Sequence, residues 1–291
     1  MQPFNTHDLQ KLFVPSETSH KGQNGKLLLI GGSSLFHAAS LWSLEIASRI
    51  VDMVFYASVQ ENNEIVLQTK KEWRGGIVVP QNDIEKYVEE ADAILIGPGM
   101  MRGEIDRSKQ IIKVEQALAL ENEVEQEYYL TKYLLQKYPS KKWIIDAGGL
   151  QMMELESIKP LHGNVVLTPN LHEFERLFDL DPLSGNVADM AAKYNCIIVL
   201  KRYTDTVCSP TECVLVEGGN AGMTKGGTGD VLSGLIAALA CNNDLYLASK
   251  CGSYINKKAG ESLYHKQGLY FNASDLALEI PKVMRELVLE E

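Results

Sequence analysis

Residues 217–240 read EGGNAGMTKGGTGDVLSGLIAALA, a glycine-dense loop followed directly by an apolar segment. Glycine permits backbone conformations with positive φ and lets the main chain approach a ligand closely. The first amides of a helix have no partners within the helix, and the helix dipole favours an anion beside them. We therefore predict a phosphate-binding loop that leads into a helix starting at about Asp230. The residues of this predicted loop are Gly226, Gly227, Thr228 and Gly229.

Asp230 has two interpretations at this position. As an N-cap residue, its carboxylate accepts hydrogen bonds from amides of the first helical turn. As a general base, it accepts a proton from a hydroxyl group beside the bound phosphate. A plain glycine-rich turn capped by Asp230 is the alternative to a phosphate loop. The segment is not another known phosphate loop, because no GxxxxGK[ST] fits and a dinucleotide fingerprint starting at Gly227 lacks its glycine at position 232.

Short apolar runs alternate with helical patterns along the rest of the chain. The runs are apolar throughout, as expected for parallel strands covered on both faces, and polar or glycine residues follow each run. The alternation predicts an α/β fold with a doubly wound, mainly parallel sheet and helices on both faces. Ligands of such sheets bind at the carboxyl ends of the strands. The predicted strands are residues 26–30, 51–57, 93–96, 143–145, 165–167 and 197–200, and the predicted helices include 37–50, 244–266 and 274–287.

Residues 104–138 are rich in charge, and their apolar positions fit one long helix or a helical hairpin. Acidic residues cluster from Glu121 to Glu127. We interpret this stretch as a solvated helical insertion rather than as an acidic binding site for a partner. No internal repeat, low-complexity tract or linker divides residues 1–291, so we expect a single domain.

The composition is that of a globular protein with an acidic balance. Hydrophobic residues make up 45% and charged residues 23%, and 28 Lys and Arg against 38 Asp and Glu give a formal charge of −10. These values exclude collagen-like and disordered classes and argue against general nucleic-acid binding. No stretch approaches 18 apolar residues, and the first 25 residues lack a signal-peptide core, so we expect neither a membrane span nor secretion. We also expect no further domain before Lys26.

The cysteines suggest a cytoplasmic protein. They form neither a CxxC pair nor a zinc-binding pattern, so we expect reduced thiols. A disulfide between Cys208 and Cys213 is the alternative. The five cysteines are Cys196, Cys208, Cys213, Cys241 and Cys251.

An ordered set of motifs resembles one family over most of the chain. GGTGDVLSGLIAALA, preceded by GNAGM, resembles the C-terminal signature of the ribokinase-like superfamily. The other motifs, in order, resemble the ADP/ATP-dependent NAD(P)H-hydrate dehydratases within it. GGTGD alone indicates only the superfamily, whereas the ordered set is more specific. These motifs are KLLLIGGS at 26–33, Ala38-Ala39, IGPG at 96–99, IDAGGL at 145–150, LTPNLHEF at 167–174 and VLK at 199–201.

The resemblance implies a role for several residues. Asp230 would be the catalytic base facing the substrate hydroxyl, and the loop ending at Gly229 would receive the transferred phosphoryl group. The implied substrate-binding residues are Ala38, Gly99, Asn170 and Asp230. The implied nucleotide-binding residues are Lys201, Arg202, Tyr203, Thr204, Asp205, Asn220 and the four loop residues. Glu173 is the candidate ligand of a Mg²⁺ ion.

The chain departs from the family pattern at four positions. Arg202 stands where the family has glycine, which puts the nucleotide contacts in doubt. Asn170 replaces a histidine, and Asn cannot carry a proton at neutral pH. His37 replaces a glycine before the first helix. Lys225 replaces a small or hydroxyl residue, and either contacts phosphate or is a solvated loop lysine.

The predicted function is repair of hydrated NADH or NADPH. ADP or ATP would be hydrolysed to AMP or ADP plus phosphate, and the chain would act with Mg²⁺ as a hydro-lyase. The resemblance also implies a homo-oligomer, with a tetramer expected. Two alternatives remain open: a small-molecule kinase of the same fold, for a vitamin precursor or a sugar, and a catalytically idle nucleotide-binding subunit. Asp146, directly after a predicted strand, is either a ligand contact or part of a structural turn.

Overall fold

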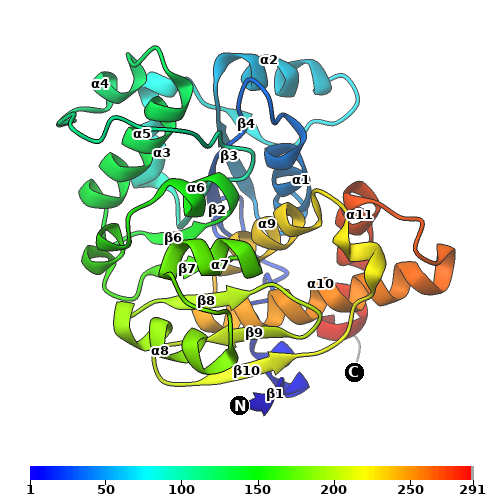
Figure 1. Cartoon of the computed structure of the whole chain (residues 1–291). Coiled ribbons are helices and arrows are strands. Elements are labelled where there is room, and N and C mark those ends of the chain that lie inside the picture. Colours follow the sequence, from blue (N-terminus) through cyan, green and yellow to red (C-terminus); the bar gives the residue numbers. More distant parts are fainter. Residues whose placement is uncertain (290–291) are drawn as a thin grey trace.

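The computed structural model describes residues 1–289, and the strands of this part form one ten-stranded sheet (Figure 1). The strands lie in the order β1-β10-β9-β8-β7-β6-β5-β2-β3-β4. Only the β8-β9 and β9-β10 pairs among them are antiparallel. The strand bounds are β1 Gln2–Pro3, β2 Lys26–Ile30, β3 Met53–Ala57, β4 Ile77–Val78, β5 Ala93–Ile96, β6 Lys142–Ile145, β7 Val165–Leu167, β8 Ile197–Leu200, β9 Asp205–Cys208 and β10 Cys213–Val216.

The predicted doubly wound sheet is confirmed. From β2 the chain moves outward through β3 to β4, then returns to the other side of β2 and continues from β5 to β8. The direction of winding therefore reverses between β2 and β5, which is the kind of switch point where open sheets bind ligands. Each predicted strand is present, and all six end at the predicted residue, where a glycine or polar residue follows.

Helices cover both faces of the sheet. Within β2, Leu27 and Leu29 belong to one hydrophobic core, whereas Leu28 and Ile30 belong to the other. Helices α1, α2, α9, α10 and α11 contribute to the first core, and α3 to α8 contribute to the second. The helix bounds are α1 Ala38–Ala47, α2 Gln60–Thr69, α3 Ile84–Glu90, α4 Val114–Leu118, α5 Glu123–Lys137, α6 Ala147–Met152, α7 Leu171–Phe178, α8 Ser184–Tyr194, α9 Thr228–Ala240, α10 Leu245–Gln267 and α11 Ala273–Met284.

The interpretation of residues 104–138 as a solvated insertion is wrong for α5. Its face with Tyr129, Leu134 and Leu135 is buried in the second core, and α5 crosses over from β5 to β6. The acidic residues at its start bind neighbouring loops. Glu123 accepts hydrogen bonds from the amide and hydroxyl of Ser34, and Glu127 accepts one from the Met101 amide.

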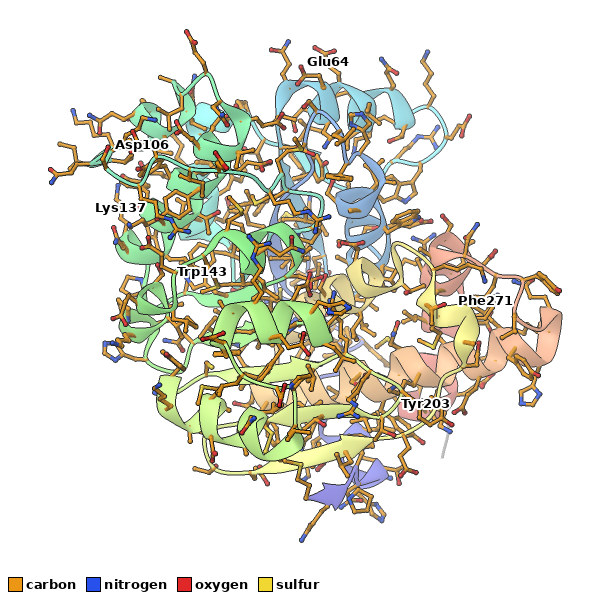
Figure 2. All side chains as sticks on the ribbon, in the orientation of Figure 1. Glu64, Asp106, Lys137, Trp143, Tyr203 and Phe271 are labelled. Atoms are coloured by element: carbon orange, nitrogen blue, oxygen red, sulfur yellow. A yellow bond between two sulfur atoms is a disulfide. The ribbon has the colours of Figure 1, made fainter. Side chains whose placement is uncertain are left out.

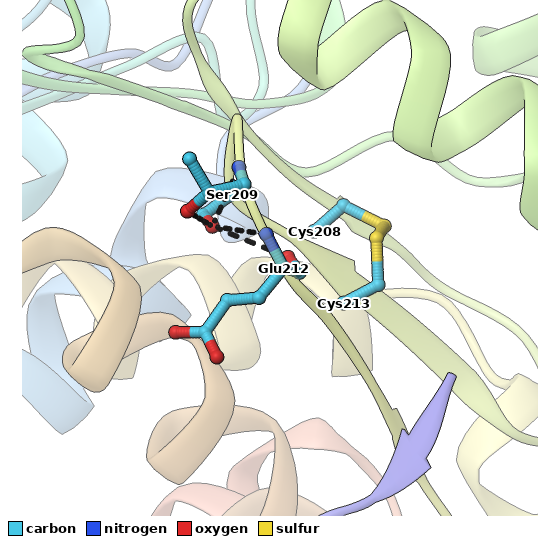
Figure 3. Close-up of a disulfide and its surroundings, with 5 residues drawn as sticks. Cys208, Ser209, Glu212 and Cys213 are labelled. Atoms are coloured by element: carbon cyan, nitrogen blue, oxygen red, sulfur yellow. Dashed lines mark hydrogen bonds between the residues drawn. A yellow bond between two sulfur atoms is a disulfide. The ribbon is translucent and has the colours of Figure 1, made fainter.

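The expectation that all cysteines are reduced thiols is also wrong. Cys208 and Cys213 form a disulfide, shown in Figure 3, because they lie opposite each other in the β9-β10 hairpin with a Cα–Cα distance of 4.1 Å. The thiols of the other cysteines are free and buried. As for membranes, no helix within residues 1–289 is both long and apolar enough to span one.

Candidate active site

Helix α9 starts two residues earlier than predicted, and Asp230 is not its N-cap. Gly227 is the N-cap, with φ of +94°, and Asp230 lies within the first helical turn. A Cβ atom at position 227 would lie 2.3 Å from the Trp42 ring, so the position requires glycine for space as well as for conformation. Gly229 does not adopt positive φ. Asp230 therefore has no capping role that would explain its presence.

The loop before α9 is braced internally. The Thr228 hydroxyl donates to the carbonyls of Met223 and Lys225, at 2.6 and 2.9 Å. The Asn220 side chain accepts from the Gly222 amide and donates to the Gly260 carbonyl. These contacts fix the main chain at the start of α9, where the first amides of a helix can bind an anion. The Thr228 amide makes only a long hydrogen bond there, 3.4 Å to the Lys225 carbonyl.

The loop borders a cavity of about 720 Å³ at the carboxyl ends of β6, β7 and β8. Two wall segments follow β8 and β10, and the start of α9 forms a third wall. Most of the predicted nucleotide-binding residues line this cavity, and Thr204 does not. Lining residues among those predicted are Asn170, Glu173, Lys201, Arg202, Tyr203, Asp205, Asn220, Gly226, Gly227, Thr228, Gly229 and Asp230.

Charged side chains gather at the inner end of the cavity. The Lys201 ammonium lies 2.7 Å from a carboxylate oxygen of Asp146, which is 1% exposed. Although burial acts to lower it, the carboxylates of Asp146, Glu173 and Asp230 raise the pKa of Lys201, so this side chain stays charged. Sequence reasoning left Asp146 open between ligand contact and turn, and its position directly after β6 was the signal that it faces the site.

Asp230 has the electrostatics of a base poised near neutral pH. Its side chain is partly open to the cavity, yet burial by the surrounding protein raises its pKa to about 7. The neighbouring carboxylate of Asp146 acts in the same direction, and Lys201 opposes both. A carboxylate with such a pKa is ionised in about half of the molecules at neutral pH and is basic enough to take a proton from a hydroxyl group.

Asn170, which replaces the family's histidine, forms a capping box with Glu173. The Asn170 side chain accepts from the Glu173 amide at 3.0 Å, and Glu173 accepts from the Asn170 amide at 2.8 Å. The other Glu173 oxygen accepts from the Gln151 side chain. Both residues line the cavity at the start of α7, and the asparagine is a stronger N-cap than a histidine would be.

Ala38 and Gly99 are not among the residues that line this cavity. Gly99 adopts φ of +75°, and a Cβ there would lie 2.7 Å from the Phe36 carbonyl and 3.2 Å from the Ala39 Cβ. Gly99 is therefore packed against the start of α1, where Ala38 is exposed. Helix α1 in turn contacts α9, since the Ser43 hydroxyl donates to the Asp230 carbonyl at 2.7 Å.

Two of the departing residues have definite surroundings. The His37 ring lies 2.7 Å from the side-chain oxygen of Asn62, which is fully buried. The Lys225 ammonium donates to the Leu269 carbonyl and lies over the Phe271 ring, although Lys225 also lines the cavity. Lys225 thus has protein partners that hold the loop to the segment before α11.

Comparison with known proteins identifies the family. The family model described as NAD(P)H-hydrate dehydratase matches residues 27–282. The chain belongs to the NAD(P)H-hydrate dehydratase family. The family resemblance predicted from the motifs is thereby confirmed.

Named members of this family align with almost the whole chain. The chain is 33% identical to the ADP-dependent (S)-NAD(P)H-hydrate dehydratase of Nitrosopumilus maritimus, covering 96% of both chains. It is also 33% identical to the bifunctional NAD(P)H-hydrate repair enzyme of Methanocaldococcus jannaschii, where 96% of this chain spans 52% of that protein. The ADP/ATP-dependent NAD(P)H-hydrate dehydratase of Bacillus subtilis, co-crystallised with ATP and Mg²⁺, has the same ribokinase-like fold, with a TM-score of 0.77, 22% identity and coverage of 98% and 99%.

Proposed function

We propose that this chain restores hydrated NADH or NADPH to the dihydronicotinamide by a dehydration that consumes an adenine nucleotide. The observation that carries the proposal is the Asp230 carboxylate, with a pKa of about 7, beside the phosphate loop at the start of α9. The family and its named members, an ADP-dependent and a bifunctional repair enzyme, support the same reaction.

The first step is transfer of a phosphoryl group to the substrate. Water is a poor leaving group, so the ring hydroxyl must first become a better one. The hydroxyl oxygen attacks the terminal phosphorus of the nucleotide while Asp230 accepts the hydroxyl proton. The bond from that phosphorus to the bridging oxygen of the nucleotide breaks, and AMP or ADP leaves.

The second step is elimination. The lone pair of the ring nitrogen expels the phosphate, and the departing phosphate accepts the proton of the adjacent carbon, which completes the dihydronicotinamide. The amides of Gly227, Thr228 and Gly229 would hold the developing phosphoryl charge at the start of α9. Lys201, which keeps its charge beside Asp146, would provide the opposing cation.

The residues present fit a Mg²⁺ ion between the protein and the phosphates. One Asp146 oxygen is buried and has no hydrogen-bond partner within residues 1–289. Mg²⁺ in nucleotide sites uses one or two carboxylates together with phosphate oxygens, and we propose Asp146 and Glu173 for this role. The ion would neutralise phosphate charge.

The remaining cavity residues would bind the rest of the nucleotide. We propose that the segment Arg202–Asp205 and the loop at Asn220 lie along the adenosine, and that Ala38, Gly99 and Asn170 contact the hydrated nicotinamide. The position of Ala38 and Gly99 beside the start of α1, which contacts α9 near Asp230, supports a substrate that reaches the base from that side.

The direct test is incubation with hydrated NADH, Mg²⁺ and either ADP or ATP. We expect recovery of dihydronicotinamide absorbance together with one free phosphate per turnover, and a recovery slower by about a hundredfold or more with the Asp230→Asn variant. A stable phosphorylated product without free phosphate would identify a kinase instead. Running ADP and ATP in parallel identifies the donor.

We also propose that the chain works in the cytoplasm as a homo-oligomer, with a tetramer expected from the family. The support for the first point is the predicted substrate, a cytoplasmic cofactor in hydrated form. Light scattering of the purified protein would give the oligomeric state, and cell fractionation would test the location.

A further inference from the structure

Lys257 of α10 lines the same cavity, far along the sequence from every motif discussed above. Its side chain is 6% exposed, which is unusual for a lysine, and such burial requires partners for the charge. The sequence gives no local sign of this position. The function proposed above does not use it.

The Lys257 ammonium joins two wall segments of the cavity. It donates to the carbonyl of Tyr203 at 2.8 Å and to that of Arg202 at 3.1 Å, both after β8. It also lies 3.4 Å from the Gly218 carbonyl, after β10. Figure 2 shows Tyr203 at the edge of the molecule near α10; its side chain is 82% exposed, so only its main chain is held.

Asp205 completes the arrangement from the other side. Its carboxylate lies 3.3 Å from the Lys257 ammonium and accepts hydrogen bonds from the Arg202 amide at 2.9 Å and the Ser253 hydroxyl at 2.7 Å. Asp205 is 4% exposed. The buried Lys257–Asp205 ion pair therefore holds the short segment after Lys201 in place at both of its ends, Arg202 and Asp205.

Removal of this ammonium would take the donor away from the partly buried carbonyls of Arg202 and Tyr203. It would also leave the buried Asp205 carboxylate with hydrogen bonds but without its cation. Such groups regain hydrogen bonds only by moving toward water, so the two segments would separate from α10 and from each other. Both segments line the cavity, so their positions shape it. A ligand that fits between them binds more weakly when they must first be ordered.

We propose that Lys257 is a positioning residue that holds the 202–205 segment and the 218–219 loop at the separation needed for an adenine nucleotide. The identity of the ligand rests on the function proposed above, whereas the ordering of the two segments does not.

The test compares Lys257→Met with wild type in two measurements. In steady-state kinetics we expect the nucleotide KM to rise about tenfold, with kcat and the KM for the hydrated cofactor within about twofold, because the phosphate loop and Asp230 are untouched. In hydrogen exchange without nucleotide, we expect faster exchange in peptides covering 202–205 and 218–219. The exchange result stands even if wild type binds no nucleotide, an outcome that would contradict only the proposed function.

Lys250→Met is the matched control. Lys250 lies two helical turns earlier on α10 and forms an ion pair with Asp8 at 2.6 Å, away from the cavity. We expect this variant to leave the nucleotide KM and exchange at both segments unchanged. If Lys250→Met raised the KM equally, the effect would be general loosening of α10 and the proposal would be overturned.

The double variant Lys257→Met/Asp205→Asn leaves no buried charge unpaired and serves if the single variant does not fold. We expect its nucleotide KM to stay raised and the two segments to exchange fast, because the carbonyls still lack their donor. Wild-type affinity and exchange in the double variant would overturn the proposal, since the single-variant effect would then come from the orphaned Asp205 charge.

Discussion

The Lys201 ammonium contacts Asp146 at 2.7 Å and also lies at the start of α9, where a Cβ on Gly229 would be 3.3 Å from it. One cation is thus shared by three acidic residues, since Glu173 and Asp230 also raise its pKa. Lys201 acts to lower the pKa of Asp230, yet burial and the neighbouring carboxylates keep this pKa at about 7. Asp230 is therefore partly ionised near neutral pH, and its ionised form can accept the proton of the substrate hydroxyl.

Asp230→Asn should abolish most of the activity and leave the fold intact. Asp230 is not the N-cap of α9, so the free energy of unfolding should fall by no more than about 1 kcal/mol. Turnover should fall on the order of a hundredfold or more, because the amide cannot accept the hydroxyl proton. Phosphate release and thermal melting measure the two effects, and near-normal turnover in a folded variant would remove Asp230 from the mechanism.

The pH dependence should report the same residue. Only the ionised form of Asp230 accepts a proton, so kcat/KM should rise with pH and level off above about 7. Lys201 acts to lower this pKa, so Lys201→Met should move the rising limb to higher pH even where activity is weak. A limb that stays in place in the Lys201→Met variant would show that another group titrates.

Stability should respond to pH in the opposite direction. Burial raises the folded-state pKa of Asp230 above its unfolded value of 3.8, so between about pH 4 and 7 the folded state holds a proton that the unfolded state has lost. This contribution to the free energy of unfolding is present at low pH and declines as pH rises to about 7. Denaturant titrations of wild type and Asp230→Asn should therefore diverge across this window, and parallel curves would contradict the raised pKa.

Two glycines of the loop should give contrasting alanine variants. Gly227→Ala places a Cβ 2.3 Å from Trp42 at positive φ and should destabilise the fold by about 1–3 kcal/mol. The Cβ of Gly229→Ala meets only the flexible end of Lys201 at 3.3 Å, so folding should be nearly unchanged while nucleotide binding and turnover weaken. Calorimetric titration with nucleotide and thermal melting separate the two effects, and unchanged affinity in Gly229→Ala would favour a plain turn.

Arg202 stands at the cavity where the family has a glycine, and a substitution shows whether this change matters for nucleotide binding. The residue lines the cavity and is exposed, and we expect its guanidinium to contact a nucleotide phosphate. Arg202→Gly should then weaken nucleotide binding by roughly 1–2 kcal/mol and flatten its salt dependence. If the glycine variant binds as well as wild type at low and at high salt, the contact does not exist.

The disulfide has a simple chemical test. Thiol titration of the unfolded, unreduced chain should find three free cysteines, and five after reduction. Reduction should lower the free energy of unfolding by about 2 kcal/mol, as expected for a cross-link that closes a short loop. Five reactive thiols before reduction would mean that Cys208 and Cys213 are not joined.

The sequence predicted what local patterns determine. Apolar runs that stop just before Gly31, Gly97 and Asp146 located β2, β5 and β6. A parallel strand that is buried on both faces must be apolar at every position, so its sequence is a continuous apolar run. The cavity followed from the same reasoning, since its polar residues come directly after strands. The glycine-dense loop and Asp230 were identified by a different signal, the glycines that run directly into an apolar helical segment.

The sequence could not predict features that depend on distant contacts. Gly227, where a Cβ would clash with Trp42, is the N-cap of α9 in place of Asp230. The acidic start of α5 contacts protein, because Glu123 accepts hydrogen bonds from Ser34 and Glu127 accepts one from the Met101 amide. Glu127 is so enclosed that burial raises its pKa to about 9, which a charged stretch does not suggest.

The close packing at Gly227 brings the loop into contact with α1 and α11, which are far apart in the sequence. The space that a side chain at position 227 would need is occupied by Trp42 of α1 and Ala273 of α11. The Trp42 ring nitrogen also donates a hydrogen bond to the Ser274 hydroxyl at 2.9 Å. The conformation of the loop therefore depends on residues outside the loop. Grafted alone into another sheet, residues 217–240 would lack the aromatic surface that shapes them, and during evolution a larger residue at 227 would need a smaller one at 42 in the same lineage.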